Sequence, residues 1–267
     1  MNLKQINNLT ELFFDQFNKQ TNKDKILLST LGDNKKNYTW QDTYDFINLV
    51  SNELRKVISK GDRCLLISEN RPEWFITDLS IMLSDGITVP AYTTYAENDY
   101  DYILNDCTPS IIFVSNTEQF NKLKNIIKDK KFIKKIFSFE KLINAEIEYI
   151  NFEDLIKNNN KKNLSIHKSL ASRKDPSCII YTSGTQGRPK GVILSHGGIL
   201  SNCEGAVDIL KPLLSKEQPR FLTWLPLSHS YEHTVQFVQI TVAARIFYAE
   251  SIDKLVKNMN DCSPEIM

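Results

Sequence analysis

The sequence predicts an α/β fold built from mostly parallel sheets flanked by helices. Short runs of entirely apolar residues, such as residues 64–67 and 111–114, predict strands that are buried on both faces. Segments with apolar residues at helical spacing alternate with these runs along the chain. Alternation of apolar strands with amphipathic helices is typical of a parallel sheet that is covered on both sides.

The individual elements follow from local signals. Thr39 is expected to cap a helix, Pro72 to open one, and Asp85-Gly86 to turn the chain into a strand. The helices are expected over residues 9–17, 40–57, 72–83, 100–105 and 199–210. The strands are expected over residues 64–67, 87–92, 111–114, 132–137, 178–181 and 192–195.

Composition excludes several classes of protein. The 267 residues carry a formal net charge of +1, which indicates neither a nucleic-acid-binding nor an anionic-membrane-binding surface. The lysine-rich residues 122–135 are better explained by a solvated helix face than by a nucleic-acid patch. No run is long and apolar enough for a transmembrane helix, and no signal peptide is recognised. A peripheral contact with the inner face of a membrane stays open.

The five cysteines are scattered and lack metal-ligand spacing. Cys64, Cys178 and Cys203 lie in apolar surroundings, so we expect reduced and buried thiols. Such thiols are typical of a cytoplasmic protein rather than of a disulfide or zinc framework.

Residues 182–191 have the composition of a phosphate-binding loop. They run Thr-Ser-Gly-Thr-Gln-Gly-Arg-Pro-Lys-Gly and follow a predicted strand. Hydroxyls donate hydrogen bonds, glycines let the backbone approach a ligand, and the two cations neutralise phosphate. The spacing does not fit the P-loop of NTPases, because the residue after Lys190 is Gly191 rather than Ser or Thr.

This loop resembles the signature of the adenylate-forming superfamily. Residues 181–192 match the pattern Y-T-S-G-[ST]-T-G-x-P-K-G-V at every fixed position except Gln186, where Thr or Ser is usual. Residues 225–232 resemble the L-P-L-x-H-x-x-E block of long-chain fatty acyl-CoA synthetases. Further stretches of the same synthetases are matched by residues 70–74, 89–92, 102–106 and 248–253. The resemblance extends from about Trp40 to the last residue.

The resemblance implies the N-terminal part of the large AMP-binding domain of these enzymes. Residues 1–175 would form its first α/β lobe. Residues 176–267 would form the strand before the phosphate loop and the start of an incomplete second lobe. The C-terminal lid domain is expected to be absent, and these residues alone are expected not to catalyse the reaction.

The implied activity is ATP-dependent conversion of a long-chain fatty acid, through an acyl-adenylate, to an acyl-CoA. ATP, CoA and the fatty acid would be the small-molecule partners, and the Mg²⁺ ligand is expected in a part of the family that this chain lacks. His229 matches the family's histidine near the substrate carboxylate and is the candidate catalytic residue, acting by orientation and charge. The residues implied in nucleotide binding are Tyr181, Thr182, Ser183, Gly184, Thr185, Gln186, Gly187 and Lys190.

Other interpretations remain. A zinc site at His229 and His233 is disfavoured because no third ligand accompanies the pair. Arg71 and Glu73 are better explained by a helix N-terminus than by a functional ion pair. Trp224 could line an acyl channel or belong to the core. The whole chain could be a non-catalytic nucleotide-binding or interaction module, or it could activate an aryl or amino acid instead.

Overall fold

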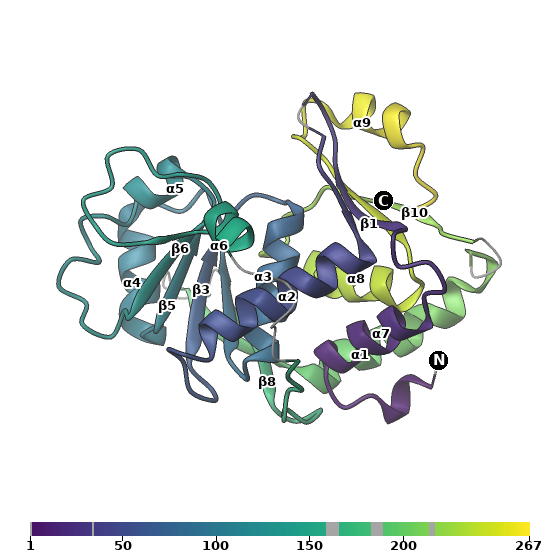
Figure 1. Ribbon diagram of the computed structural model, residues 1–267, viewed down its shortest axis with the longest axis horizontal. Helices are drawn as coiled ribbons and strands as arrows, with labels where there is room; N and C mark the ends of the chain where they lie inside the picture. Colours follow the sequence, from purple (N-terminus) through teal and green to yellow (C-terminus); the bar gives the residue numbers. More distant parts are fainter. Residues whose placement is uncertain (1, 34, 159–165, 183–188, 214–216) are drawn as a thin grey trace.

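The computed structural model describes residues 2–33, 35–158, 166–182, 189–213 and 217–267. Figure 1 shows the seven-stranded sheet on one side of the molecule and the four-stranded sheet on the other, with helices between and around them. The helices are α1 (Leu9–Lys19), α2 (Trp40–Leu54), α3 (Pro72–Leu83), α4 (Glu97–Cys107), α5 (Thr117–Asn121), α6 (Phe152–Asn158), α7 (His196–Ile209), α8 (Ser230–Thr241) and α9 (Leu255–Cys262). Short 3-10 turns lie at Leu3–Gln5 and Lys211–Leu213.

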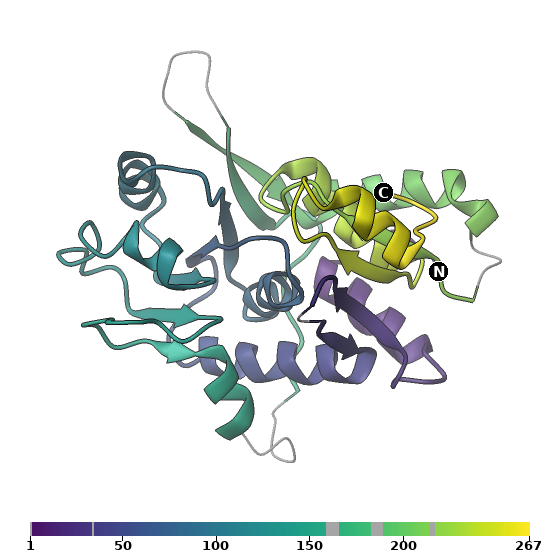
Figure 2. The same ribbon diagram turned by 90° about the horizontal axis from the view of Figure 1, so that it is seen from above.

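The seven-stranded sheet has the order β7-β6-β5-β3-β4-β8-β9. Its strands are β3 (Arg63–Ile67), β4 (Ile87–Ala91), β5 (Ile111–Val114), β6 (Lys135–Ser138), β7 (Ile150–Asn151), β8 (Pro176–Thr182) and β9 (Lys190–Ser195). All neighbouring pairs are parallel except β8 and β9, which form an antiparallel hairpin. This hairpin extends beyond the body of the molecule in Figure 2.

The four-stranded sheet has the order β10-β11-β1-β2. Its strands are β1 (Ile26–Thr30), β2 (Asn37–Thr39), β10 (Arg220–Thr223) and β11 (Arg245–Tyr248). The pairs are parallel except for β1 with β2. Each sheet therefore combines strands from both sides of residue 175, while the division into two lobes at that residue stays a prediction.

Strands β3, β4, β5 and β6 are buried on both faces, as their apolar composition predicted, whereas β9 at the sheet edge is largely exposed. Leu66 and Phe113 belong to the main core, which also takes in α1, α2, α3 and α8. Leu65 and Ile112, their neighbours in sequence, belong to a second core beneath α4. Successive side chains of a strand point to opposite faces, so the two cores share one sheet.

Local signals set the starts of α2 and α3 as expected, whereas α4 and α7 each begin three residues earlier than expected. Thr39 caps α2 in a capping box with Asp42: the Thr39 hydroxyl accepts from the Asp42 N–H, and the Asp42 carboxylate accepts from the Thr39 N–H. Pro72 is the first residue of α3, where its missing N–H costs nothing. The parallel α/β architecture is confirmed, and all five cysteines are free and buried.

The lysine-rich residues 122–135 differ from the prediction. They do not form a regular helix: after α5 the chain makes a series of turns. Hydrogen bonds that span three residues, such as Ile126 N–H to Leu123 O, are mixed with bonds that span four, such as Ile127 N–H to Leu123 O. Lysines at 124, 128 and 131 would lie on one face of a helix and repel one another. The strand that follows begins at Lys135, three residues later than expected.

None of the helices in the described ranges is long and apolar enough to cross a membrane.

Candidate functional site

The loop expected to bind phosphate joins β8 to β9. Thr182, the last residue of β8, lies directly opposite Lys190, the first residue of β9. Both are exposed, and neither side chain has a hydrogen-bond or ion-pair partner among the described residues. Cross-strand partners project to the same face, so a hydroxyl and an ammonium group lie side by side at the end of the hairpin.

The other residues expected in this loop cannot be placed. Five of the predicted nucleotide-binding residues lie outside the described residues: Ser183, Gly184, Thr185, Gln186 and Gly187. Arg188, the second cation of the loop, lies there too. Their part in nucleotide binding stays a prediction.

Tyr181 anchors the hairpin from inside. Its side chain is 3% exposed, and its hydroxyl donates a 2.5 Å hydrogen bond to the carboxylate of Asp106 at the end of α4. Burial, together with this hydrogen bond, raises the pKa of the Tyr181 hydroxyl well above its usual value. Opposite it, a Cβ on Gly191 would come within 3.2 Å of the Tyr181 ring and 2.9 Å of Ile179. The absence of a side chain at Gly191 therefore lets the Tyr181 ring lie across the hairpin.

The segment of residues 224–229 connects β10 to α8 and is held by Asn70. The Asn70 side-chain amide donates to the carbonyl of Leu225 at 2.6 Å, and its oxygen accepts from the N–H of Leu227 at 2.9 Å. One side chain thus satisfies two backbone groups of a segment that has no regular structure of its own. The N-R-P-E-W stretch and the L-P-L stretch, more than 150 residues apart in sequence, are joined at this point.

His229, the candidate catalytic residue, is the N-cap of α8. Its ring Nδ1 accepts a hydrogen bond from the N–H of Tyr231 at 3.2 Å, and the residue is otherwise exposed. The structure therefore presents the remaining ring nitrogen to solvent at a helix N-terminus, where negative charge is favoured. Within the described part of the chain, no hydrogen bond or ion pair links His229 to Thr182 or Lys190.

His233, one turn further along α8, has a different role. It is 0% exposed and lies 2.8 Å from the carboxylate of Asp78 in α3, which is also fully buried. Burial opposes a charged imidazole, but the Asp78 carboxylate raises the pKa of His233 to about 10. The pair therefore forms a buried ion pair that fixes α8 against α3, and the edge of Trp74 packs against the His233 ring at 5.3 Å between centroids.

Glu232 lies beside it in the first turn of α8 and has no cationic partner in the part of the chain that the structure describes. Burial raises the pKa of its carboxyl to about 7, although a hydrogen bond with Thr223 acts in the opposite direction. Glu232 lines a cavity of about 820 Å³ between α7, α8 and β10. The walls of this cavity are largely apolar and include Phe221 and Trp224. Trp224 thus borders a cavity, whereas Phe221 both borders it and belongs to the core.

Arg71 and Glu73 lie at a helix N-terminus, as the favoured interpretation of the sequence expected, and they also form an ion pair. Glu73 does lie in the first turn of α3. It also forms a 2.9 Å ion pair with Arg71, which bonds Glu140 at 2.8 Å, and it accepts a hydrogen bond from Tyr38 at 2.7 Å. Burial opposes a charged Glu73, but attraction to Arg71 and the hydrogen bonds from Arg71 and Tyr38 together lower the pKa of its carboxyl. The group holds α3, β2 and the end of β6 together.

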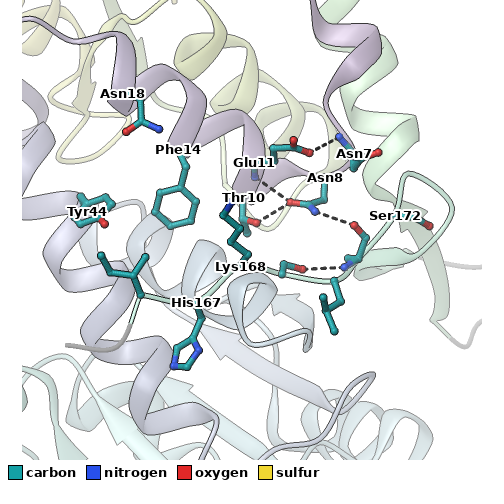
Figure 3. A pocket seen from close by; sticks show the side chains of 14 residues that line it. Asn7, Asn8, Thr10, Glu11, Phe14, Asn18, Tyr44, His167, Lys168 and Ser172 are labelled. Carbon is teal, nitrogen blue, oxygen red and sulfur yellow. Dashed lines mark hydrogen bonds between the residues drawn. The ribbon is translucent and has the colours of Figure 1, made fainter. Parts of the chain in front are cut away.

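A second cavity, of about 530 Å³, lies away from these residues (Figure 3). It is bounded by α1 and by residues 166–172, with Phe14 and Tyr44 in its wall. Asn8 closes one end by donating to the carbonyl of Ala171 at 2.8 Å. Of the residues predicted to bind nucleotide, the three that the structure describes, Tyr181, Thr182 and Lys190, do not border it.

No group of three or more His, Cys, Asp or Glu suited to a metal ion occurs in the ranges that the structure describes. His229 and His233 do not face a common point, because one is exposed and the other is paired with Asp78.

Comparison of the sequence with models of protein families identifies the family that has this arrangement. The family model described as AMP-binding enzyme matches residues 13–267. The chain belongs to the AMP-binding enzyme family. The match includes the β8–β9 hairpin, the Asn70 contact and His229.

Curated members of this family with similar sequences are acyl-CoA synthetases and ligases. Long chain acyl-CoA synthetase 3 from Arabidopsis thaliana is 28% identical over 246 residues, which are 86% of this chain and 36% of that protein. Long-chain-fatty-acid–CoA ligase ACSBG2 from Mus musculus is 28% identical over 221 residues, or 79% of this chain and 33% of that protein. The chain thus spans about a third of the length of the curated relatives that it matches.

Solved structures of similar fold include two enzymes of low sequence identity. The anthranilate CoA ligase AuaEII in complex with anthranoyl-AMP has a TM-score of 0.84 at 19% identity, covering 99% of this chain and 50% of that chain. The luciferase-like enzyme from Zophobas morio has a TM-score of 0.80 at 19% identity, covering 99% and 59%. These likenesses concern the fold alone.

The sequence analysis missed the residues that hold the predicted motifs in place. Asn70 and Asp106 both lie within matched stretches but were assigned no role. Asp78 carries a signal in hindsight, since it is a carboxylate in the middle of a helix in which eight of the twelve residues are apolar. Its partner His233 was noted only as a possible zinc ligand.

Proposed function

We propose that this chain forms the ATP-binding part of a long-chain fatty acid–CoA ligase. The observation that carries the proposal is the end of the β8–β9 hairpin, where Thr182 and Lys190 lie opposite each other without partners among the described residues. Between them runs the loop whose sequence matches the family signature. Membership of the AMP-binding enzyme family and the names of the similar curated proteins support the same assignment.

The first step needs no protein nucleophile. An oxygen of the fatty carboxylate attacks the α-phosphorus of ATP; an O–P bond forms, and the bond to the departing pyrophosphate breaks. Such a step depends on in-line placement and on neutralising the charge that builds up on the leaving group. Lys190 would carry positive charge to the β- and γ-phosphate oxygens, and Thr182 would donate its hydroxyl. The predicted loop hydroxyls and N–H groups would complete the contact.

The second step forms the thioester. The thiol of CoA releases its proton to solvent and its sulfur attacks the acyl carbon; the C–S bond forms, and AMP leaves with the electrons of the C–O bond. His229 would orient the carboxylate and the α-phosphate in the first step, because it lies exposed at the positive end of α8. No described cluster fits Mg²⁺, so no step is assigned to the metal on these residues.

The apolar cavity beside α8 is the proposed place for the acyl chain. It opens next to the helix that His229 caps, and its volume of about 820 Å³ is of the size that ligand pockets commonly have. An aliphatic chain suits walls formed by Ile199, Leu210 and Trp224 better than an amino acid does.

The test is exchange of labelled pyrophosphate into ATP, measured on the full-length protein with a panel of acids. Long-chain fatty acids should support exchange, and aryl and amino acids should not. Lys190→Ala and His229→Ala should each reduce the rate by a factor of about 100 or more, the usual cost of losing one charge-stabilising contact. ATP binding without exchange for any acid would instead favour a non-catalytic nucleotide-binding module.

A further inference from the structure

Two arginines stand next to each other in the four-stranded sheet. Arg220 begins β10 and Arg245 begins β11, and the two are register partners in the parallel pair. Like charges placed directly opposite in a sheet destabilise it. Such an arrangement needs a source of negative charge to offset the repulsion.

Among the described residues, only one of the two arginines is paired with a carboxylate. Arg220 bonds both carboxylate oxygens of Glu265, at 2.9 and 3.3 Å. Arg245 makes no ion pair with any described carboxylate. Its guanidinium donates to the hydroxyl of Ser29 at 3.4 Å and lies 4.6 Å from the centre of the Phe247 ring. Burial, and then the nearby Arg220, lower the pKa of Arg245.

A cavity of about 250 Å³ lies where these side chains meet. It is on the face of the sheet that α9 partly covers, since Phe247 and Cys262 of that face also line it. Its polar lining includes three cationic side chains and one carboxylate: Ser29, Lys35, Asn37, Arg220, Arg245 and Asp261. Glu265 neutralises Arg220. The two remaining cations, Lys35 and Arg245, still exceed the single negative charge of Asp261.

We propose that this cavity binds an oxyanion of the phosphate class, with the guanidinium of Arg245 as its principal ligand. Arginine suits this role because its planar fork donates two parallel hydrogen bonds to neighbouring oxygens. Lys35 adds charge at the rim, and the amide of Asn37 adds N–H donors. The site is separate from the proposed active site: the arginines lie at the amino ends of β10 and β11, whereas residues 224–229 follow the carboxyl end of β10.

The experiment follows thermal unfolding of the Lys190→Ala protein in inorganic phosphate and in sodium chloride of equal ionic strength. Lys190→Ala weakens phosphate binding at the β8–β9 loop, so that the two proposed sites are tested apart. Phosphate should raise the midpoint by about 2–4 °C over chloride at saturation. Adding Arg245→Gln should abolish this rise. Adding Lys124→Gln, which removes an exposed charge elsewhere, should leave it intact and controls for the general stabilising effect of phosphate.

The outcomes decide the proposal. Arg245→Gln removes a repulsion, so the unliganded protein should melt at the same temperature or higher; a purely structural arginine would give a lower midpoint. A rise that survives Arg245→Gln, or no rise in Lys190→Ala alone, overturns the proposal. If Arg245→Gln fails to fold, Arg245→Lys is used instead. It keeps the positive charge but lacks the planar group that donates two parallel hydrogen bonds. Calorimetry with phosphate should then show affinity reduced by a factor of about 10, and unchanged affinity would contradict the site.

Discussion

The two segments expected to meet ATP are held in opposite ways. Residues 224–233 are fixed on both sides, by the amide of Asn70 and by the buried ion pair of His233 with Asp78. The end of the β8–β9 hairpin projects from the sheet, and its side chains Thr182 and Lys190 are exposed. Its anchor is Tyr181, one residue before the loop.

This difference matches the two proposed tasks. Orienting a carboxylate for in-line attack requires a histidine whose position is fixed by its support. Binding a polyphosphate requires hydrogen-bond donors that have no partner within the protein. The same contrast appears within α8, between two adjacent buried residues. The Asp78 carboxylate stabilises a charged His233, whereas Glu232 has no cationic partner among the described residues and its pKa is raised to about 7.

The largest effect is expected from breaking the support of α8. Asp78→Ala leaves His233 buried without its counter-charge and should lower the free energy of unfolding by about 3–5 kcal/mol. Chemical denaturation at pH 7 measures it, with Asp129→Ala on the exposed surface as the control. An effect below 1 kcal/mol would mean that the pair does not hold the helix.

The same pair predicts a pH dependence. The pKa of His233 is raised to about 10, so its contribution to stability is complete below about pH 6.5, the unfolded value. That contribution is lost as the pH rises through 10. The decline should be absent in Asp78→Ala.

Glu232 should show a pH dependence in a different window. Its pKa is raised to about 7, so between pH 4.5 and 7 the folded state binds more protons than the unfolded one. Stability therefore falls as the pH rises, by roughly 3 kcal/mol once Glu232 is charged in both states. Glu232→Gln should remove this fall, and Glu146→Gln, an exposed match, should keep it. Parallel curves for Glu232→Gln and wild type would refute a buried neutral carboxyl.

Weakening the contacts that hold residues 224–229 should lower the free energy of unfolding by less than Asp78→Ala does. Asn70→Ala removes two hydrogen bonds and leaves the N–H of Leu227 without its partner. It should lower the free energy of unfolding by about 1–3 kcal/mol. Amide exchange at Leu227 should become faster, while Asn125→Ala, on an exposed turn, should change neither quantity. Unaltered exchange would show that the segment is held by something else.

The smallest effect is expected at the hairpin. Tyr181→Phe keeps the buried ring and loses only the bond to Asp106, which is exposed and can bind water instead. The expected loss is about 0.5–1.5 kcal/mol. Tyr231→Phe, on an exposed tyrosine, is the control. A loss as large as that of Asp78→Ala would remove the contrast between the two segments.

Much of the fold could be predicted because local signals and tertiary packing agree. Pro72 and Thr39 start their helices as expected, and residues 111–114 are a strand buried on both faces. The prediction of a helix over the lysine-rich residues 122–135 was wrong. Like charges four residues apart, such as Lys124 and Lys128, disfavour a helix there, and hydrophobic periodicity does not count them. The antiparallel β9 was also not foreseen, since an apolar run does not reveal its direction.

The candidate site could be predicted only as far as motifs reach. Thr182, Lys190 and His229 follow from the resemblance, but their supports do not. Asn70 contacts Leu225 and Leu227 across about 155 residues, and no local pattern encodes such a pairing. Asp78 and His233 are likewise separated by 155 residues and meet only because α3 and α8 pack together.

The central claim is that the β8–β9 turn holds the β- and γ-phosphates of ATP. The most direct measurement is the ratio of the affinities for ATP and AMP, obtained by equilibrium binding to the wild type and to the double variant Thr182→Ala/Lys190→Ala. The wild type should prefer ATP, and the double variant should bind both nucleotides about equally. The same preference for ATP in both proteins would contradict the account.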